Sequence, residues 1–185
     1  GKSYLIFGGT DLGGTIDLAS LTATQGLIIR GKTATSNYTY FSVSRAGDVN
    51  GDGYPDIMIS RHYGAGAQLF RNNRGAGFTE VFPGNFPGRY SNNLLIDRHD
   101  CRFGDVNNDR LQDIYCTKGS DYGLGYKENE LWVQGANGFV KRSKEFGVMD
   151  PWGRGRFCAF IDVNHDGFVD LFVANEAGRP DGQDS

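Results

Sequence analysis

Short runs of β-branched and aromatic residues alternate along the chain with clusters of glycine, asparagine, aspartate and proline, and no long helical period appears. Apolar runs of this length, bounded by turn-forming residues, predict β-strands. Residues 142–149 are expected to form one short helical turn. The expected strands lie at residues 3–7, 26–31, 40–44, 56–60, 68–72, 78–81, 100–103, 114–117, 130–133, 138–141, 156–160 and 171–175.

One polar pattern, Asp-Val-Asn-x-Asp-x-x-x-Asp, interrupts these runs three times. The copies begin at Asp48, Asp105 and Asp162, which are spaced by 57 residues each time. A fixed period of this kind indicates a repeat architecture, in which each repeat is one supersecondary unit. Each copy lies between two expected strands, and two further strands complete the repeat.

Four short strands in each repeat predict an all-β fold of antiparallel four-stranded sheets. Small residues crowd the strands that precede the loops, as expected near the axis of radially arranged sheets, so we favour a β-propeller over a linear stack. The chain holds about three blades' worth of strands. We divide it into a half blade (1–39), two blades (40–96 and 97–153) and a half blade (154–185).

A three-bladed ring would leave little taper for each sheet, because propellers use four to eight blades. We therefore expect the remaining blades to come from the same chain or from neighbouring chains. A longer polypeptide is favoured, since neither end carries a start residue or a natural stop.

The repeated loops carry oxygen ligands of the kind that a hard cation prefers. In the first loop, oxygen donors occupy alternate positions at Asp48, Asn50 and Asp52 and recur at Asp56, with the backbone carbonyl of Tyr54 between them. Calcium takes six to eight such oxygens. An EF-hand would need flanking helices and a glutamate at position twelve, where this chain has Ile59, Cys116 and Val173. A metal-free Asx-rich turn is the alternative.

Position six of the loop also distinguishes the three copies. Gly53 and Gly167 allow the sharp turn that folds the donors inward. Arg110 takes this position in the second loop, so it must either strain the turn or shift it. We therefore expect weaker cation binding at the second loop.

Charge and composition limit the expected cellular location of the protein and the classes of partner that it could bind. The nine loop aspartates belong to 22 acidic residues, against 19 Lys plus Arg, so the net charge of −3 arises locally in the loops. No basic cluster indicates nucleic acid, and no apolar run approaches membrane-spanning length. Asn37, in Asn37-Tyr38-Thr39, is a candidate N-glycosylation site. The glycosylation triplet and the expected calcium loops favour an extracellular or cell-surface location.

The remaining reactive residues give no catalytic constellation. His62, His99 and His165 are scattered, and we interpret them as structural. Trp132 and Trp152 are candidates for stacking on sugars, but we favour core positions for both. Cys101 and Cys116 flank the second loop and could face each other across a hairpin as a disulfide; three buried thiols, including Cys158, are the alternative.

The loop from Gly47 to Asp56, with Phe7, Gly8 and Gly9 after the first strand, resembles FG-GAP repeats such as those of the integrin α-subunit propeller. Residues 69–79 are similar to the related VCBS repeats. This resemblance implies a propeller of about seven blades, with structural calcium in the loop that joins the first two strands of a blade. By position, the implied ligands are Asp48, Asn50, Asp52, the Tyr54 carbonyl and Asp56; Asp105, Asn107, Asp109, the Leu111 carbonyl and Asp113; and Asp162, Asn164, Asp166, the Phe168 carbonyl and Asp170.

The resulting hypothesis is a non-catalytic extracellular module for adhesion or recognition, stabilised by three calcium ions and binding a protein or glycan partner. Two alternatives remain open: a structural subunit of a cell-surface or filamentous assembly, and part of a propeller polysaccharide lyase or hydrolase. The fold does not choose between them, because one fold hosts many functions.

Overall fold

A computed structural model describes residues 2–6, 17–22, 24–30, 41–61, 67–81, 98–119 and 127–176 of the 185-residue chain. The Asn37 glycosylation triplet, His62, the glycines after the first strand and the polar segment 177–185 lie outside these ranges. The chain forms two compact units, Gly1–Thr39 and Tyr40–Ser185, which are described separately.

The described residues of the first unit form one antiparallel strand pair, β1 (Lys2–Ile6) with β2 (Gly26–Arg30). Tyr4 lies opposite Ile28 in the register of this pair. A turn precedes β2, in which the Asp17 side chain accepts hydrogen bonds from the Ala19 amide and the Ser20 hydroxyl. These two strands agree with the sequence prediction to within one residue at each end.

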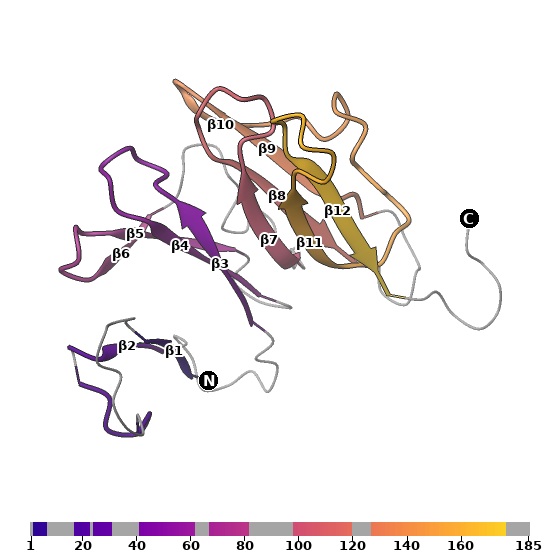
Figure 1. Cartoon of the computed structure of the whole chain (residues 1–185). Helices are drawn as coiled ribbons and strands as arrows, with labels where there is room; N and C mark the ends of the chain where they lie inside the picture. Colours follow the sequence, from indigo (N-terminus) through magenta and orange to yellow (C-terminus); the bar gives the residue numbers. More distant parts are fainter. Residues whose placement is uncertain are drawn as a thin grey trace. The chain divides into compact units, whose positions relative to one another are not determined.

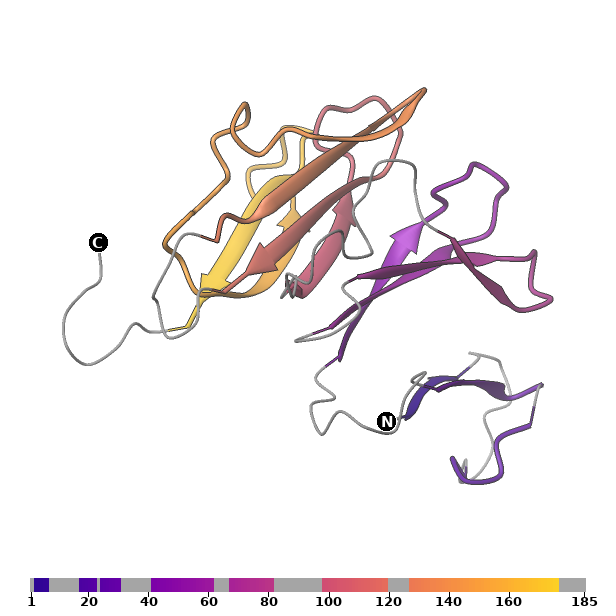
Figure 2. The same cartoon turned by 180° about the vertical axis from the view of Figure 1, so that it is seen from behind.

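The described residues of the second unit form ten strands in three antiparallel sheets (Figures 1 and 2). Sheet order follows chain order, so each strand pairs with its neighbour in sequence. The first sheet has β3 (Phe41–Gly47), β4 (Asp56–Arg61), β5 (Gln68–Asn72) and β6 (Phe78–Val81). The second has β7 (Arg98–Gly104), β8 (Asp113–Lys118), β9 (Glu130–Gly135) and β10 (Gly138–Lys141). The third has β11 (Gly155–Ile161) and β12 (Asp170–Asn175).

This arrangement confirms the prediction of an all-β fold built from four-stranded antiparallel sheets. The described residues contain no helix, and none of them forms a helical segment that could cross a bilayer. The helical turn expected at residues 142–149 is a hydrogen-bonded turn over residues 143–147. Its Phe146 amide donates to the Arg142 carbonyl, a single α-type bond that does not continue into a helix.

Apolar side chains fill the space between successive sheets of the second unit. Met58 of β4 and Leu69 of β5 project from one face of the first sheet, and they pack with Ile114 of β8 and Trp132 of β9. Because side chains alternate between the two faces of a strand, the neighbours of Ile114 and Trp132 point the other way. Tyr115, Leu131 and Val133 accordingly pack against the third sheet.

The two tryptophans differ in environment. Trp132 is 7% exposed and lies in the core, as predicted, because its strand pairs on both sides. The prediction that Trp152 is a core residue is wrong: it is 56% exposed. Trp152 lies in the connection between β10 and β11, where no strand pleat directs alternate side chains inward.

Candidate metal centres

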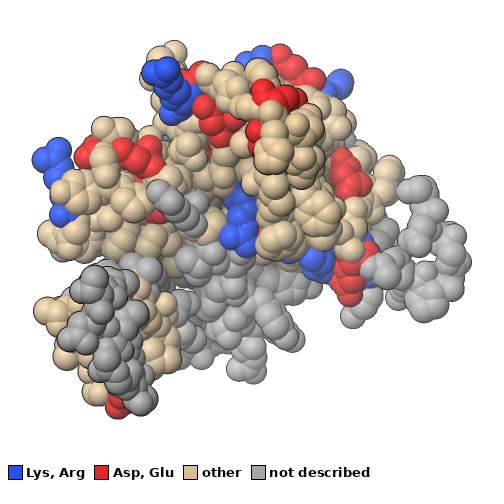
Figure 3. Space-filling view, in the orientation of Figure 1, with Lys and Arg blue, Asp and Glu red and all other residues tan. Residues whose placement is uncertain are grey.

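The three aspartate-rich loops lie at the same end of the sheets in the second unit. They join β3 to β4, β7 to β8 and β11 to β12, on the upper side of Figure 1. Acidic side chains gather along this side in the space-filling view (Figure 3). Each loop connects the first two described strands of its sheet, so three sets of carboxylates are presented along one edge of the unit.

The first aspartate of every loop accepts two backbone amides of its own loop. Asp48 Oδ1 accepts the Asp52 amide at 2.9 Å, and Asp48 Oδ2 accepts the Gly53 amide at 2.6 Å. In the second loop, Asp105 accepts the equivalent amides of Asp109 and Arg110. In the third loop, Asp162 accepts those of Asp166 and Gly167. The middle aspartates, Asp52, Asp109 and Asp166, each accept the amide two residues later. The loops therefore share one folded conformation.

The last aspartate closes each loop and ties it to the sheet. Asp56 Oδ2 accepts the Val49 amide and Oδ1 accepts the Asn72 amide at the end of β5. Asp113 repeats this with Val106 and, in β9, with Gln134. Asp170 accepts the amide of Val163 in the same way. This aspartate is thus a structural residue as well as a candidate ligand.

Two positions of each loop require a left-handed backbone. At position six, φ is 88° at Gly53, 70° at Arg110 and 88° at Gly167. The second loop keeps the turn, so Arg110 carries the strain that the sequence predicted. Position four is also left-handed, which sequence reasoning missed; it is occupied by Gly51, Asn108 and His165, with φ of 74°, 59° and 59°. Asparagine and histidine are among the residues that tolerate this region best, and this explains the placement of His165.

Electrostatics within the loops disfavours crowding of the carboxylates. Burial raises the pKa of Asp56, and the charges of Asp48 and Asp52 raise it further, while the Asn72 and Val49 amides oppose the shift. Burial raises the pKa of Asp113 as well, and the two other aspartates of its loop add to the effect. A bound cation would compensate this repulsion directly.

The donor chemistry of the loops fits a hard divalent cation. A carboxylate has about four lone-pair sites, so an oxygen that accepts one amide retains a site for a metal ion. The side chains at position seven, Tyr54, Leu111 and Phe168, are exposed, and only their carbonyls are available as ligands. Among the described residues, however, no three His, Cys, Asp or Glu side chains converge closely enough to hold a metal. The carboxylates would have to draw together when a cation binds.

Each loop makes a hydrogen bond with a neighbouring repeat. The Asn108 side-chain amide donates to the Gly167 carbonyl at 3.1 Å, which joins the second loop to the third. The Gln134 side-chain amide donates to the Val49 carbonyl at 3.1 Å, which joins the second sheet to the first loop. These contacts tie the second repeat to the first and third loops.

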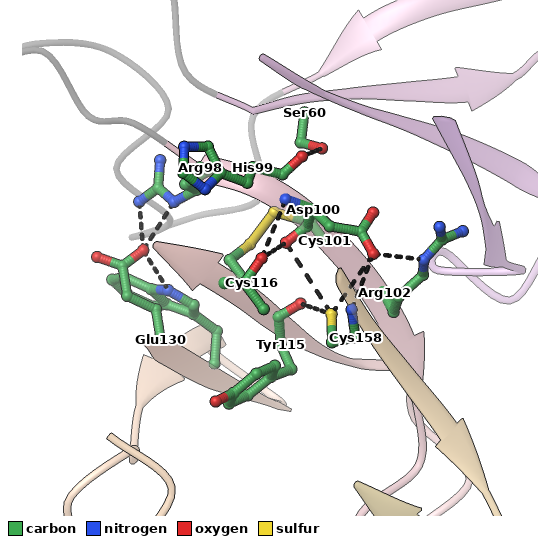
Figure 4. The surroundings of a disulfide bond; sticks show 12 residues. Ser60, Arg98, His99, Asp100, Cys101, Arg102, Tyr115, Cys116, Glu130 and Cys158 are labelled. Atoms are coloured by element: carbon green, nitrogen blue, oxygen red, sulfur yellow. Dashed lines mark hydrogen bonds and ion pairs between the residues drawn. A yellow bond between two sulfur atoms is a disulfide. The ribbon is translucent and has the colours of Figure 1, made fainter. Parts of the chain in front are cut away.

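The second sheet carries a disulfide between Cys101 and Cys116 (Figure 4). The two residues face each other on β7 and β8, with Cα atoms 4.1 Å apart. Of the two alternatives that the sequence left open, the structure thus has the disulfide. Cys158, which occupies the position equivalent to Cys101 on β11, is a buried free thiol, and burial strongly raises its pKa.

A buried ion pair, which sequence reasoning missed, lies at the end of the second sheet away from its aspartate-rich loop; Figure 4 shows two of its residues, Arg98 and Glu130. Arg98 of β7 and Lys118 of β8 both contact Glu130 of β9. Burial works against ionisation of Glu130, but the two cations outweigh it and hold the pKa of this carboxyl below its ordinary range. The nearby His99 ring contacts the Gly155 carbonyl and Arg156, which agrees with the structural role predicted for it.

A sequence profile described as FG-GAP-like repeat matches the chain twice, over residues 48–116 and 105–173. The two matches together cover more than half of the chain, and each begins at the first aspartate of a loop. The chain belongs to the FG-GAP-like repeat family. The FG-GAP-like period therefore coincides with the 57-residue spacing of the loops. Searches of curated proteins and of solved structures returned no match.

Proposed function

We propose that the chain is a calcium-stabilised extracellular recognition or adhesion module, in which calcium is structural and a protein or glycan partner binds elsewhere. The observation that carries this proposal is the agreement of the three loops. Each presents the same order of oxygen donors, the same hydrogen bonds to its first and middle aspartates, one closing bond to its last aspartate and the same two left-handed positions. A polar turn that binds no metal would not require the same donors at the same positions in three copies.

Each ion would be held by one loop. In the first loop the proposed ligands are the side chains of Asp48, Asn50, Asp52 and Asp56 and the Tyr54 carbonyl. The equivalent sets are Asp105, Asn107, Asp109, Leu111 and Asp113 in the second loop, and Asp162, Asn164, Asp166, Phe168 and Asp170 in the third. The bound ion would supply positive charge that offsets the repulsion between three carboxylates. Because the last aspartate also holds the following strands, binding would stiffen the sheet.

An extracellular location is supported by two features. The Cys101–Cys116 disulfide suits an oxidising compartment. Loops of this donor type work at the high calcium concentrations found outside cells, where modules bind calcium with Kd on the order of 10⁻⁴–10⁻³ M. The exposed indole of Trp152 offers a flat apolar surface on which a sugar ring could stack, so a glycan remains within the proposed class of partners.

Thermal unfolding tests the calcium part of this proposal. At a calcium concentration tenfold above Kd, each site contributes about 1.4 kcal/mol, so three sites should raise the Tm by roughly 10 °C relative to excess EDTA. Magnesium should give a smaller shift, because it demands octahedral geometry and dehydrates reluctantly. An equal Tm in calcium and in EDTA would contradict structural calcium. Glycan-array and cell-binding assays, run with Trp152→Ala as a comparison, test the recognition part.

A further inference from the structure

Gln134, on β9, contacts two of the aspartate-rich loops at once. Its backbone amide donates to Asp113 Oδ1, in the second loop, at 2.8 Å. Its side-chain amide donates to the carbonyl of Val49, in the first loop, at 3.1 Å. The Val49 amide in turn donates to Asp56 Oδ2 at 2.9 Å. These hydrogen bonds join the proposed last ligand of the second loop to that of the first.

The length of the Gln134 side chain makes this connection possible. Asn72 holds the equivalent position in the first sheet, because its backbone amide donates to Asp56 Oδ1 as that of Gln134 does to Asp113. The Asn72 side chain is one methylene shorter, and it donates to the carbonyl of Pro55, within its own loop, at 3.1 Å. The extra methylene lets the glutamine amide reach the neighbouring loop instead.

Close packing supports the same connection. Gly47 directly precedes Asp48, the first aspartate of the first loop, and a Cβ at Gly47 would lie 2.9 Å from the Gln112 side chain. Gln112 directly precedes Asp113 in the second loop. Because packed groups transmit displacements to their neighbours, a movement of one loop here would be felt by the other.

The second loop is also connected to the third. The Asn108 side-chain amide donates to the Gly167 carbonyl at 3.1 Å. The Gly167 amide donates to Asp162 Oδ2, on the proposed first ligand of the third loop. The bond between Asn108 and Gly167 is exposed to water, whereas that between Gln134 and Val49 is partly buried and should therefore couple its loops more strongly.

We propose that the loops bind calcium cooperatively, so that occupation of the first and third loops raises the calcium affinity of the second. This inference rests on the proposed function, because it concerns the same three sites. When a loop binds its ion, its carboxylates draw together and its hydrogen-bonded neighbours lose conformational freedom. A neighbouring loop then meets a partner that is already ordered, and it loses less entropy when it binds. The neighbours thereby support the loop that carries the strained Arg110.

Calcium titration of the isotopically labelled full chain, followed by NMR, measures the affinity of each loop separately. The amide of Arg110 reports the second loop, because it donates to the first aspartate of that loop; those of Gly53 and Gly167 report the others. Asp48→Asn removes a charged ligand of the first loop and should weaken calcium binding at the second loop about fivefold. Asp162→Asn should weaken it about twofold, through the exposed contact.

Two variants that keep every proposed ligand test whether these contacts carry the effect. Gln134→Asn introduces the shorter side chain found in the first sheet. It should weaken the second loop about fivefold and make it insensitive to Asp48→Asn, but not to Asp162→Asn. Asn108→Gly introduces the residue that the first loop has here, left-handed Gly51. It should make the second loop insensitive to Asp162→Asn alone, so each variant is the matched control for the other.

The result that would overturn this coupling differs from the one that would overturn the proposed function. If three ions bind but Asp48→Asn leaves the affinity of the second loop unchanged or raises it, the loops are not cooperative and structural calcium stands. The coupling also fails if Gln134→Asn remains as sensitive to Asp48→Asn as the wild type. Amide signals that do not respond to calcium in any loop would overturn both proposals. The amide spectrum of each variant also shows whether its sheets remain folded.

Discussion

Arg110 has a backbone φ of 70°, in the same left-handed region as Gly53, its counterpart 57 residues earlier, with φ of 88°. The two residues also make the same hydrogen bond, since each donates its amide to Oδ2 of the first aspartate of its loop. The loop conformation is thus kept where its glycine is lost. The cost is backbone strain, because an L-residue with a Cβ is disfavoured in this region by about 1–2 kcal/mol.

Arg110→Gly should relieve this strain and stabilise the protein by about 1 kcal/mol. The gain is the lost strain minus the larger conformational entropy that glycine brings to the unfolded chain. Urea unfolding of both proteins in EDTA measures the difference in the free energy of unfolding without any contribution from calcium.

The reciprocal change, Gly167→Arg, is the control for this prediction. It places the same side chain at the same position of the third loop and should destabilise the protein by a similar amount. A neutral or destabilising effect of Arg110→Gly would show that the guanidinium makes compensating interactions in the second loop.

Loss of the Cys101–Cys116 disulfide should lower the free energy of unfolding by about 3 kcal/mol. The bond spans 15 residues, and closing a loop of this size restricts the unfolded chain by roughly that amount. The double variant Cys101→Ala, Cys116→Ala should therefore melt about 10 °C below the wild type. Reductant should lower the Tm of the wild type towards that of the double variant and leave the double variant unchanged. A wild-type Tm that does not respond to reductant would argue against the bond.

Glu130→Gln should destabilise the protein by about 3 kcal/mol at neutral pH, because it removes the charge of a buried carboxylate that both Arg98 and Lys118 contact. The effect depends on pH with a definite sign. A carboxyl with a lowered pKa in the folded state contributes its full stability above its unfolded pKa, and this contribution is lost as the pH falls through the folded value. The difference between wild type and variant should therefore be constant from pH 8 to about 5 and shrink below about pH 4.

The exposed pair of Arg142 and Glu145 provides the control for Glu130. Glu145→Gln removes the same charge at the surface and should have no measurable effect on stability at neutral pH. If Glu130→Gln also left the free energy of unfolding unchanged, the buried pair would contribute nothing to stability. A difference that grew as the pH fell would mean that the sign of the pKa shift at Glu130 is wrong.

The strands and the repeat could be predicted from the sequence because both depend on local pattern. The pattern of apolar runs and turn residues located all twelve described strands to within three residues, the largest difference being at the end of β3, and the 57-residue period located the loops. Features set by pairing across strands could not be read in the same way. The disulfide depends on the register of β7 with β8, in which Cys101 lies opposite Cys116. The Glu130 ion pair joins three strands.

The proposed calcium ligands could be predicted from the sequence only in part. Their type and spacing are visible in the sequence, and the structure shows that they lie in three equivalent loops at one edge. The left-handed backbone at Asn108 and His165 escaped prediction because these residues tolerate that conformation without requiring it, whereas a glycine at the same position, such as Gly51, signals it directly. Trp152 was wrongly predicted to lie in the core, because it belongs to a turn, where side chains do not alternate between a buried and an exposed face as they do in a strand.

The central claim is that each loop holds one calcium ion, and counting bound ions tests it most directly. Equilibrium dialysis of the full chain against millimolar calcium, with Asp48→Asn, Asp105→Asn and Asp162→Asn measured in parallel, gives the number of ions per chain. We predict three ions for the wild type, with the weakest site in the second loop, and one fewer for each variant. A wild-type chain that binds no calcium, or variants that retain all three ions, would contradict it.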